Sequence, residues 1–185
     1  MLAKVVMLRE AVLDSLTHYQ GAVYRGHDPR WSFSPESGDG AKRNGGRFNP
    51  IGTPALYTAL SQNGAWVEAQ QGFKFKAQPL TICQYEVDCE RVLDLTDEMV
   101  LLSCGIKPSS LSCAWMAQID KKETPDSWVL SSELIALNVS GIIVPSFASS
   151  ATAEMKNMVF WNWNTRPPNM VKVIDDFDRL PKEPY

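Results

Sequence analysis

The chain has 185 residues, of which 44% are hydrophobic and 21% charged, and its formal net charge at pH 7 is −3. This length and composition predict one globular domain, spanning residues 1–185, that buries its own core. The negative net charge argues against direct nucleic-acid binding, because a protein that binds phosphate backbones needs clustered Lys and Arg. It favours a small-molecule or protein partner.

The four cysteines indicate neither a metal site nor a disulfide framework. They form no Cys-x-x-Cys pair, and the only histidines, His18 and His27, are far from them in sequence. Buried, reduced thiols are the simpler interpretation. No signal-peptide pattern is present, since Arg9-Glu10 interrupts the first apolar run, and no apolar stretch reaches transmembrane length. We therefore expect a cytoplasmic protein without membrane contact.

The first predicted elements are a helix and a short strand. Apolar residues recur at helical spacing over 2–19, which predicts an amphipathic helix with a packing role. Residues 21–26 are predicted as a strand that ends at a glycine, with Arg25 at its exit. Arginine in such a place is more often a surface ion-pair partner, but strand ends that face a glycine-rich loop also bind ligands.

Residues 27–54 are rich in Gly, Pro, Ser and Asn and lack helical periodicity. Loops longer than about 12–15 residues are uncommon in compact domains and are usually functional or disordered. Trp31, Phe33 and Phe48 give this loop apolar side chains to bury, so we predict an ordered binding loop. Within it, Gly45-Gly46-Arg47 places an arginine beside glycines, where the backbone can approach an anionic ligand. A solvated connector is the competing interpretation.

A strand predicted over 55–59 carries Tyr57, and a helix predicted over 64–72 carries Glu68. With Arg47 in the preceding loop, this spacing allows three polar functions to meet at one cleft. A glutamate in the middle of a helix is usually solvated. If Glu68 instead faces the cleft, its carboxylate can stabilise positive charge that develops on a substrate.

The rest of the chain is predicted to supply scaffold up to residue 138 and a last group of strands after it. The predicted strands cover 80–87, 92–95, 141–144, 157–161 and 171–174, and the predicted helices cover 98–103, 112–120 and 127–138. Ser146 follows the buried strand 141–144. No Gly-x-Ser-x-Gly motif surrounds it, which argues against a Ser-His-Asp hydrolase.

Strands outnumber long helices in this pattern and do not alternate with them as a doubly wound sheet requires. The chain also lacks a Gly-x-Gly-x-x-Gly motif and a P-loop, so a Rossmann domain or a nucleoside-triphosphatase is not indicated. The sequence therefore predicts an α+β domain with a largely antiparallel sheet.

Several of these stretches together resemble the RES domain, a family named for its Arg, Glu and Ser. They are Ser37–Ala41, Gly45–Pro50, Gly52–Tyr57, Glu68, Val144–Ser146 and Asn157. The resemblance runs from about residue 24 to residue 180 and leaves the N-terminal helix outside. Phe48 stands where the family commonly has Trp, and residues 27–36 match less cleanly, so Arg30 and Trp31 receive no role.

The resemblance implies the fold of ADP-ribosyltransferase toxins, with twisted, mostly antiparallel sheets and flanking helices. It also implies a bacterial toxin that cleaves NAD⁺ at the nicotinamide–ribose bond, depletes cellular NAD⁺ and stops growth. NAD⁺ is then a substrate, with no separate cofactor and no metal. The expected partner is an antitoxin with an Xre-like helix-turn-helix domain, and homo-oligomerisation stays open. The alternatives are a mono-ADP-ribosyltransferase that modifies a protein, or a non-catalytic interaction module.

Transferred position by position, the resemblance assigns catalytic roles to Arg47, Tyr57, Glu68 and Ser146, and NAD⁺ contacts to these four together with Arg25 and Asn49. The two arginines would hold the pyrophosphate, and Tyr57 would stack on the nicotinamide ring. Glu68 would stabilise an oxocarbenium-like ribose. Ser146 would orient Glu68 or the nicotinamide ribose by hydrogen bonding.

Overall fold

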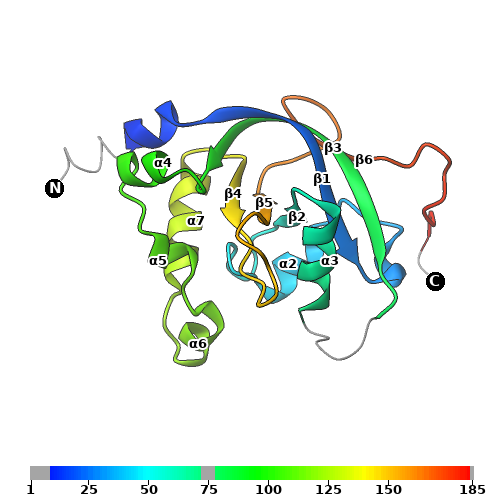
Figure 1. Ribbon diagram of the computed structural model, residues 1–185, viewed down its shortest axis with the longest axis horizontal. Coiled ribbons are helices and arrows are strands. Elements are labelled where there is room, and N and C mark those ends of the chain that lie inside the picture. The colour runs from blue at the N-terminus through cyan, green and yellow to red at the C-terminus, as the bar shows by residue number, and fades with distance from the viewer. Residues whose placement is uncertain (1–8, 72–77, 184–185) are drawn as a thin grey trace.

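A long strand, β3 (Thr81–Asp94), organises the sheet of this α+β domain (Figure 1). The computed structural model describes residues 9–71 and 78–183. The six strands lie in the order β1-β2-β5-β4-β3-β6, with an additional pairing of β1 to β3. The other strands are β1 (Thr17–His27), β2 (Leu56–Ala59), β4 (Gly141–Pro145), β5 (Lys156–Phe160) and β6 (Asn169–Val173).

The additional pairing of β1 with β3 joins β1, β2, β5, β4 and β3 into a closed circuit, and β6 pairs with β3 outside it. β1 runs antiparallel to β3 from Thr17 opposite Val92 to His27 opposite Thr81. β1 also pairs with β2, but through a single register pair, Tyr24 with Ala59. Among the strand pairs within residues 9–71 and 78–183, only that of β3 with β4 is parallel, which confirms the predicted, largely antiparallel sheet.

Two apolar cores lie on the two faces of the curled sheet. Alternate residues of β3 are buried, as the two-residue period of a strand requires, and Tyr85 and Val87 pack inward with Val23 and Phe160. The opposite face packs against helices that gather at one end of the molecule (Figure 1). The helices of this core are α4 (Glu98–Ser103), α5 (Pro108–Leu111) and α7 (Asp126–Ala136), and α6 (Trp115–Asp120) lies between α5 and α7 in the chain.

The predicted helix over 2–19 was wrong at its C-terminal end. Residues 9–14 are helical, residues 2–8 lie outside the described part of the chain, and Thr17 already begins β1. The strand starts there because Thr17 finds a partner in Val92, which supplies backbone hydrogen bonds that local periodicity does not reveal.

The two strands predicted over 80–87 and 92–95 form one continuous β3. Its neighbour changes along one edge, from β6 opposite residues 85–89 to β4 opposite residues 92–94. Arg91 adopts a positive φ of 61° at this change. The gap predicted between the two strands, residues 88–91, therefore marks an exchange of partners and not an interruption of the strand.

The long segment before β2 is ordered, as predicted, but it contains two short helical pieces that were not predicted. They are a 3₁₀ turn, η1 (Pro29–Trp31), and the helix α2 (Asp39–Asn44). The next helix, α3 (Gln62–Gln70), begins two residues before the predicted start and packs against β1 and β2. No helix within residues 9–71 and 78–183 is long and apolar enough to cross a membrane.

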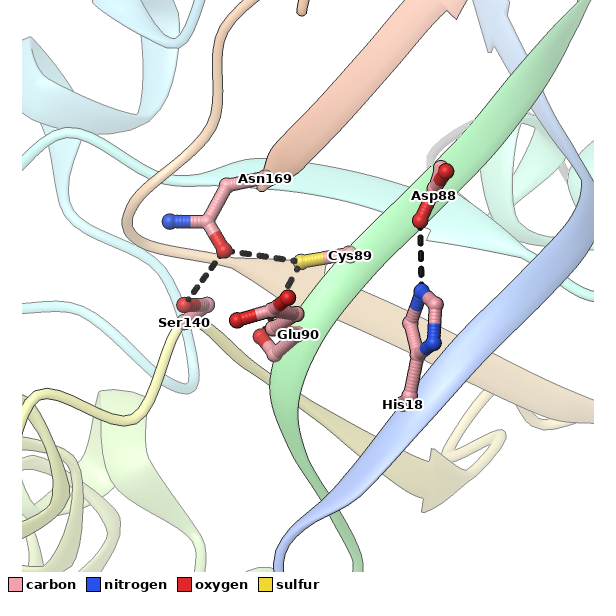
Figure 2. A network of polar contacts seen from close by, with 6 residues as sticks. All are labelled: His18, Asp88, Cys89, Glu90, Ser140 and Asn169. Atoms are coloured by element: carbon pink, nitrogen blue, oxygen red, sulfur yellow. Dashed lines mark hydrogen bonds and ion pairs between the residues drawn. The ribbon is translucent and has the colours of Figure 1, made fainter. Parts of the chain in front are cut away.

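A small polar network ties β3 and β6 to the start of β4 (Figure 2). The Asn169 side-chain oxygen accepts hydrogen bonds from Ser140 Oγ at 3.0 Å and from Cys89 Sγ at 3.7 Å. Burial raises the pKa of the Cys89 thiol to about 12, which keeps its proton available for donation. The His18–Asp88 pair of Figure 2 lies on β1 and β3 at 2.5 Å and is more exposed.

Replacement of Asn169 by Ala should lower the free energy of unfolding by about 1–3 kcal/mol, because the buried Ser140 hydroxyl loses its acceptor and Cys89 Sγ keeps only the Glu90 carbonyl. Urea denaturation measures the change. The matched substitution Asn162→Ala alters an exposed asparagine and should stay within about 0.5 kcal/mol of wild type. Equal effects of the two substitutions would contradict a structural role for the network.

Candidate functional site

The Gly45-Gly46-Arg47 segment is held by side chains from outside the loop. The carbonyl of Gly46 accepts from Trp128 Nε1 at 2.7 Å, and that of Arg47 accepts from Ser127 Oγ at 2.5 Å. The carbonyl of Phe48 accepts from Trp161 Nε1 at 2.8 Å. Three consecutive carbonyls thus have side-chain donors, so Arg47 projects from a fixed backbone.

Tyr57 and Asn49 interlock beneath this segment. The Tyr57 hydroxyl donates to Asn49 Oδ1 at 2.7 Å and accepts from the backbone N–H of Phe48 at 2.9 Å. Burial raises the pKa of the Tyr57 phenol above its ordinary value, although the Phe48 hydrogen bond and Arg47 oppose the shift. Residue 46 must be glycine here, since a Cβ would lie 2.5 Å from the Tyr57 hydroxyl.

Glu68 reaches from α3 toward the ends of two neighbouring strands. Its Oε1 accepts a hydrogen bond from Ser146 Oγ, just after β4, and another from Asn157 Nδ2 of β5 at 2.5 Å. Gln71 Nε2 donates to its Oε2. The helix lies close to β1 because residue 26 is glycine, where a Cβ would be 2.9 Å from that of Ala69.

Arg47 is positioned from both sides. Its Nη1 donates to the carbonyl of Cys113 at 2.7 Å, and its guanidinium carbon lies 4.6 Å from the centroid of the Phe147 ring. Burial lowers the pKa of Arg47, while charges on Cys113, Glu68 and Tyr57 oppose the shift. The guanidinium lines the same cavity as Glu68.

Two cavities meet at these side chains. The first, of about 310 Å³, lies between β1, β2 and α3, and we call it the Arg25 cavity. The second, of about 210 Å³, is the Arg47 cavity, which Phe147 also borders. Both are lined by Tyr57, Glu68 and Asn157. Three polar side chains thus form a wall common to two compartments.

The structure brings Arg47, Tyr57, Glu68 and Ser146 together, as the sequence resemblance leads one to expect, and it places Arg25 in the adjoining cavity. Asn49 lines neither cavity. It is 0% exposed, and its amide donates to the carbonyls of Ala41, Pro50 and Thr53. It supports Tyr57, and its contact with a substrate stays a prediction.

Asn157 and residues 111–116 are parts of the site to which sequence reasoning gave no role. Asn157 is the second residue of β5, just before its buried apolar run, and a polar side chain in that place is itself a signal, because buried polar groups need partners. The segment 111–116 was predicted to be scaffold only. It supplies backbone acceptors for Arg47 and the walls Trp115 and Met116, a role visible only after folding.

Among residues 9–71 and 78–183, no group of three or more His, Cys, Asp or Glu side chains is placed to hold a metal ion. All four cysteines are unpaired. Cys83, Cys89 and Cys104 are buried, as predicted, whereas Cys113 is partly exposed beside Arg47.

His27, at the end of β1, is partly buried with both ring nitrogens lacking a hydrogen-bond partner among the described residues. Burial, with a smaller contribution from Arg25 and against an opposing one from Asp28, lowers the pKa of His27 to about 4. The imidazole is therefore neutral at pH 7.

Comparison with known proteins places this geometry in context. A family model described as the RES domain matches residues 22–182. The chain is similar to a solved structure of the M. tuberculosis MbcT-MbcA toxin-antitoxin complex, with 18% sequence identity and a TM-score of 0.62. The match covers 91% of this chain and 89% of that chain, which shows a shared α+β fold. No curated protein matches the chain.

A pair of glycine substitutions tests the interlock around Tyr57. Gly46→Ala should destabilise the protein by about 1–3 kcal/mol, because its Cβ meets the Tyr57 hydroxyl and, at 2.7 Å, Asn49 Oδ1. Gly40→Ala is the control, since a Cβ there meets nothing within 4 Å and alanine favours helix α2. Thermal denaturation distinguishes them, and equal stability of the two variants would refute the interlock.

Stability should depend on pH through His27. Unfolded histidine has a pKa of about 6.5, so between about pH 6.5 and pH 4 the unfolded chain binds a proton that the folded chain does not. Stability therefore falls as the pH is lowered through this window, and His27→Gln should flatten the fall. Denaturant titrations at several pH values measure it. His18→Gln, the control, should retain the fall, and a wild-type slope in His27→Gln would contradict the assignment.

Proposed function

The chain belongs to the RES domain family, and from this membership and the geometry of the site we propose that it binds NAD⁺ and cleaves the bond between nicotinamide and ribose. The observation that carries the proposal is the Glu68 carboxylate, held by Ser146 and Asn157 on the wall between two cavities. A fixed anion at such a wall can face charge that develops on a bound substrate.

Cleavage of the nicotinamide–ribose bond is helped by a carboxylate that is already in position before the reaction begins. When the C1′–N bond breaks, its electron pair stays on the nicotinamide nitrogen and neutralises the ring, while the ribose becomes oxocarbenium-like. Glu68 would stabilise this positive charge. Because hydrogen bonds from Ser146 and Asn157 already orient its Oε1, little reorganisation is required during the reaction.

The remaining predicted residues suit the rest of the substrate. Arg25 and Arg47 each offer a guanidinium at one of the two cavities, and guanidinium groups pair well with a pyrophosphate. The Tyr57 hydroxyl is occupied by Asn49 and Phe48, so the tyrosine would act through its ring face, stacking on the cationic nicotinamide.

The ADP-ribosyl group must then pass to an acceptor, and water or inorganic phosphate is the acceptor in our leading proposal. A protein acceptor, which would make the chain a mono-ADP-ribosyltransferase, is favoured by one observation. The Arg47 cavity is bordered by Met116, which is 64% exposed and leaves an apolar rim that a polypeptide can contact.

We extend the proposal to the role in the cell. NAD⁺ depletion by this activity would arrest growth, so the chain would act as a bacterial toxin restrained by an antitoxin with an Xre-like helix-turn-helix domain. The likeness of its fold to a chain of a toxin–antitoxin complex supports this role.

The decisive test is nicotinamide release from NAD⁺ by the purified protein. Glu68→Gln keeps the shape of the side chain but removes its charge, so the rate should fall by about 10²–10³-fold. Glu133→Gln, on the exposed face of α7, should retain the wild-type rate. Chromatography of the products identifies the acceptor.

Circular dichroism and a thermal melt confirm that each variant is folded before rates are compared. A folded Glu68→Gln protein that releases nicotinamide at the wild-type rate would refute the role of Glu68. Release of no nicotinamide by the wild type in the presence of phosphate and bacterial lysate would refute the enzymatic proposal as a whole.

A further inference from the structure

A third cavity, of about 300 Å³, adjoins the site, and of its lining residues only Arg25 has a substrate role assigned above. Its walls come from the end of β1, the η1 turn and helix α2, and they combine aromatic rings with cationic groups. The residues that matter here are Arg25, His27, Trp31, Phe33, Asp39 and Arg43. Arg25 also lines the Arg25 cavity defined above, so one arginine is common to that cavity and the third cavity.

The segment that forms one wall of this third cavity is rigidly held. Arg25 Nη1 donates to the carbonyls of Pro35 and Ser37 at 2.8 and 2.9 Å. Tyr85 donates a second hydrogen bond to Pro35 at 2.7 Å, and Trp163 Nε1 donates to the carbonyl of Glu36 at 3.0 Å. Three consecutive carbonyls are again satisfied by side chains, so the cavity is a built feature of the fold.

Trp31 stands at this cavity with 55% of its surface exposed. Its position is fixed, because Asp28 caps the η1 turn and the carbonyl of Asp28 accepts from the Trp31 N–H at 2.9 Å. The ring of Phe33 lies 6.2 Å away at a tilt of 46°, which braces the indole without covering its face. An exposed indole on an ordered turn offers a flat apolar surface for a flat ligand.

The charged groups favour a ligand that is anionic at one end. Arg25 and Arg43 both contribute to the lining, and His27 adds no charge at pH 7 because its ring is neutral. Asp39 is the acidic side chain of the lining and can accept from an amino group on a base edge. Aromatic surface, guanidinium groups and hydrogen-bonding edges together suit a purine nucleotide.

We propose that the third cavity binds the adenylate end of NAD⁺. The inference rests on the proposed function and specifies how the dinucleotide lies: nicotinamide ribose at Glu68, pyrophosphate at Arg25 and adenine against Trp31. The arrangement follows from the shared arginine, since the pyrophosphate is the part of the dinucleotide that joins its two nucleosides. It gives Trp31, which the resemblance left without a role, a direct contact with the substrate.

The test is binding of AMP, followed by isothermal titration calorimetry, because AMP carries the adenylate without the scissile bond. Base–aromatic stacking predicts that Trp31→Ala weakens AMP binding roughly tenfold or more, whereas Trp31→Phe, which keeps a ring face, stays within about threefold of wild type. Trp66→Ala removes another exposed indole, on α3, which lines none of the three cavities, and should bind AMP as the wild type does.

Ribose 5-phosphate separates recognition of the base from recognition of the phosphate, and it should bind at least tenfold more weakly than AMP. The proposal is overturned if wild type does not bind AMP at millimolar concentration, if Trp31→Ala binds it as tightly as wild type, or if ribose 5-phosphate binds equally well. These measurements need no turnover. If AMP binds in a Trp31-dependent way but the protein releases no nicotinamide, the adenylate site stands and only the proposed NAD⁺ cleavage is refuted. If the protein releases nicotinamide but does not bind AMP, the cleavage stands and the adenylate site is refuted.

Discussion

The site depends on hydrogen bonding of the backbone carbonyls of residues 46–48. A loop that enters the interior must satisfy its polar groups, and here the donors are two indoles and a hydroxyl from Trp128, Trp161 and Ser127. These donors stand on α7 and just after β5, so the loop joins the helical end of the molecule to the sheet. Arg47 and Tyr57 take their positions from this anchoring.

The cleft itself arises from the way in which the sheet closes. β1 and β2 share only the pair Tyr24–Ala59, while β1 pairs with β3 over its whole length. The short contact leaves the Arg25 cavity between β1, β2 and α3, with Glu68 on its wall. The side chains that hold Glu68 are Asn157 of β5, the neighbour of β2 in the sheet, and Ser146, just after β4. The strands that close the sheet thus also carry or border the side chains of the site.

Local pattern predicted most elements, and it failed where partners distant in sequence decide the outcome. Helix α3 and strand β4 follow from spacing and apolar runs that any window reveals. Residues 17–19 were predicted to extend the first helix but pair with β3, and residues 88–91 were predicted to separate two strands but lie inside β3. In both places the hydrogen bonds offered by another strand outweigh local preference.

The sequence by itself determined the α+β class, the ordered glycine-rich loop and the RES domain motifs, because glycine spacing, apolar period and motif order are local properties. Tertiary structure alone decided that Asn49 is enclosed, that Asn157 holds Glu68 and that carbonyls of residues 111 and 113 receive Arg47. It also decided that Arg25 links two cavities. The physical reason is that a hydrogen bond joins groups close in space, and only packing of the whole chain sets which groups those are.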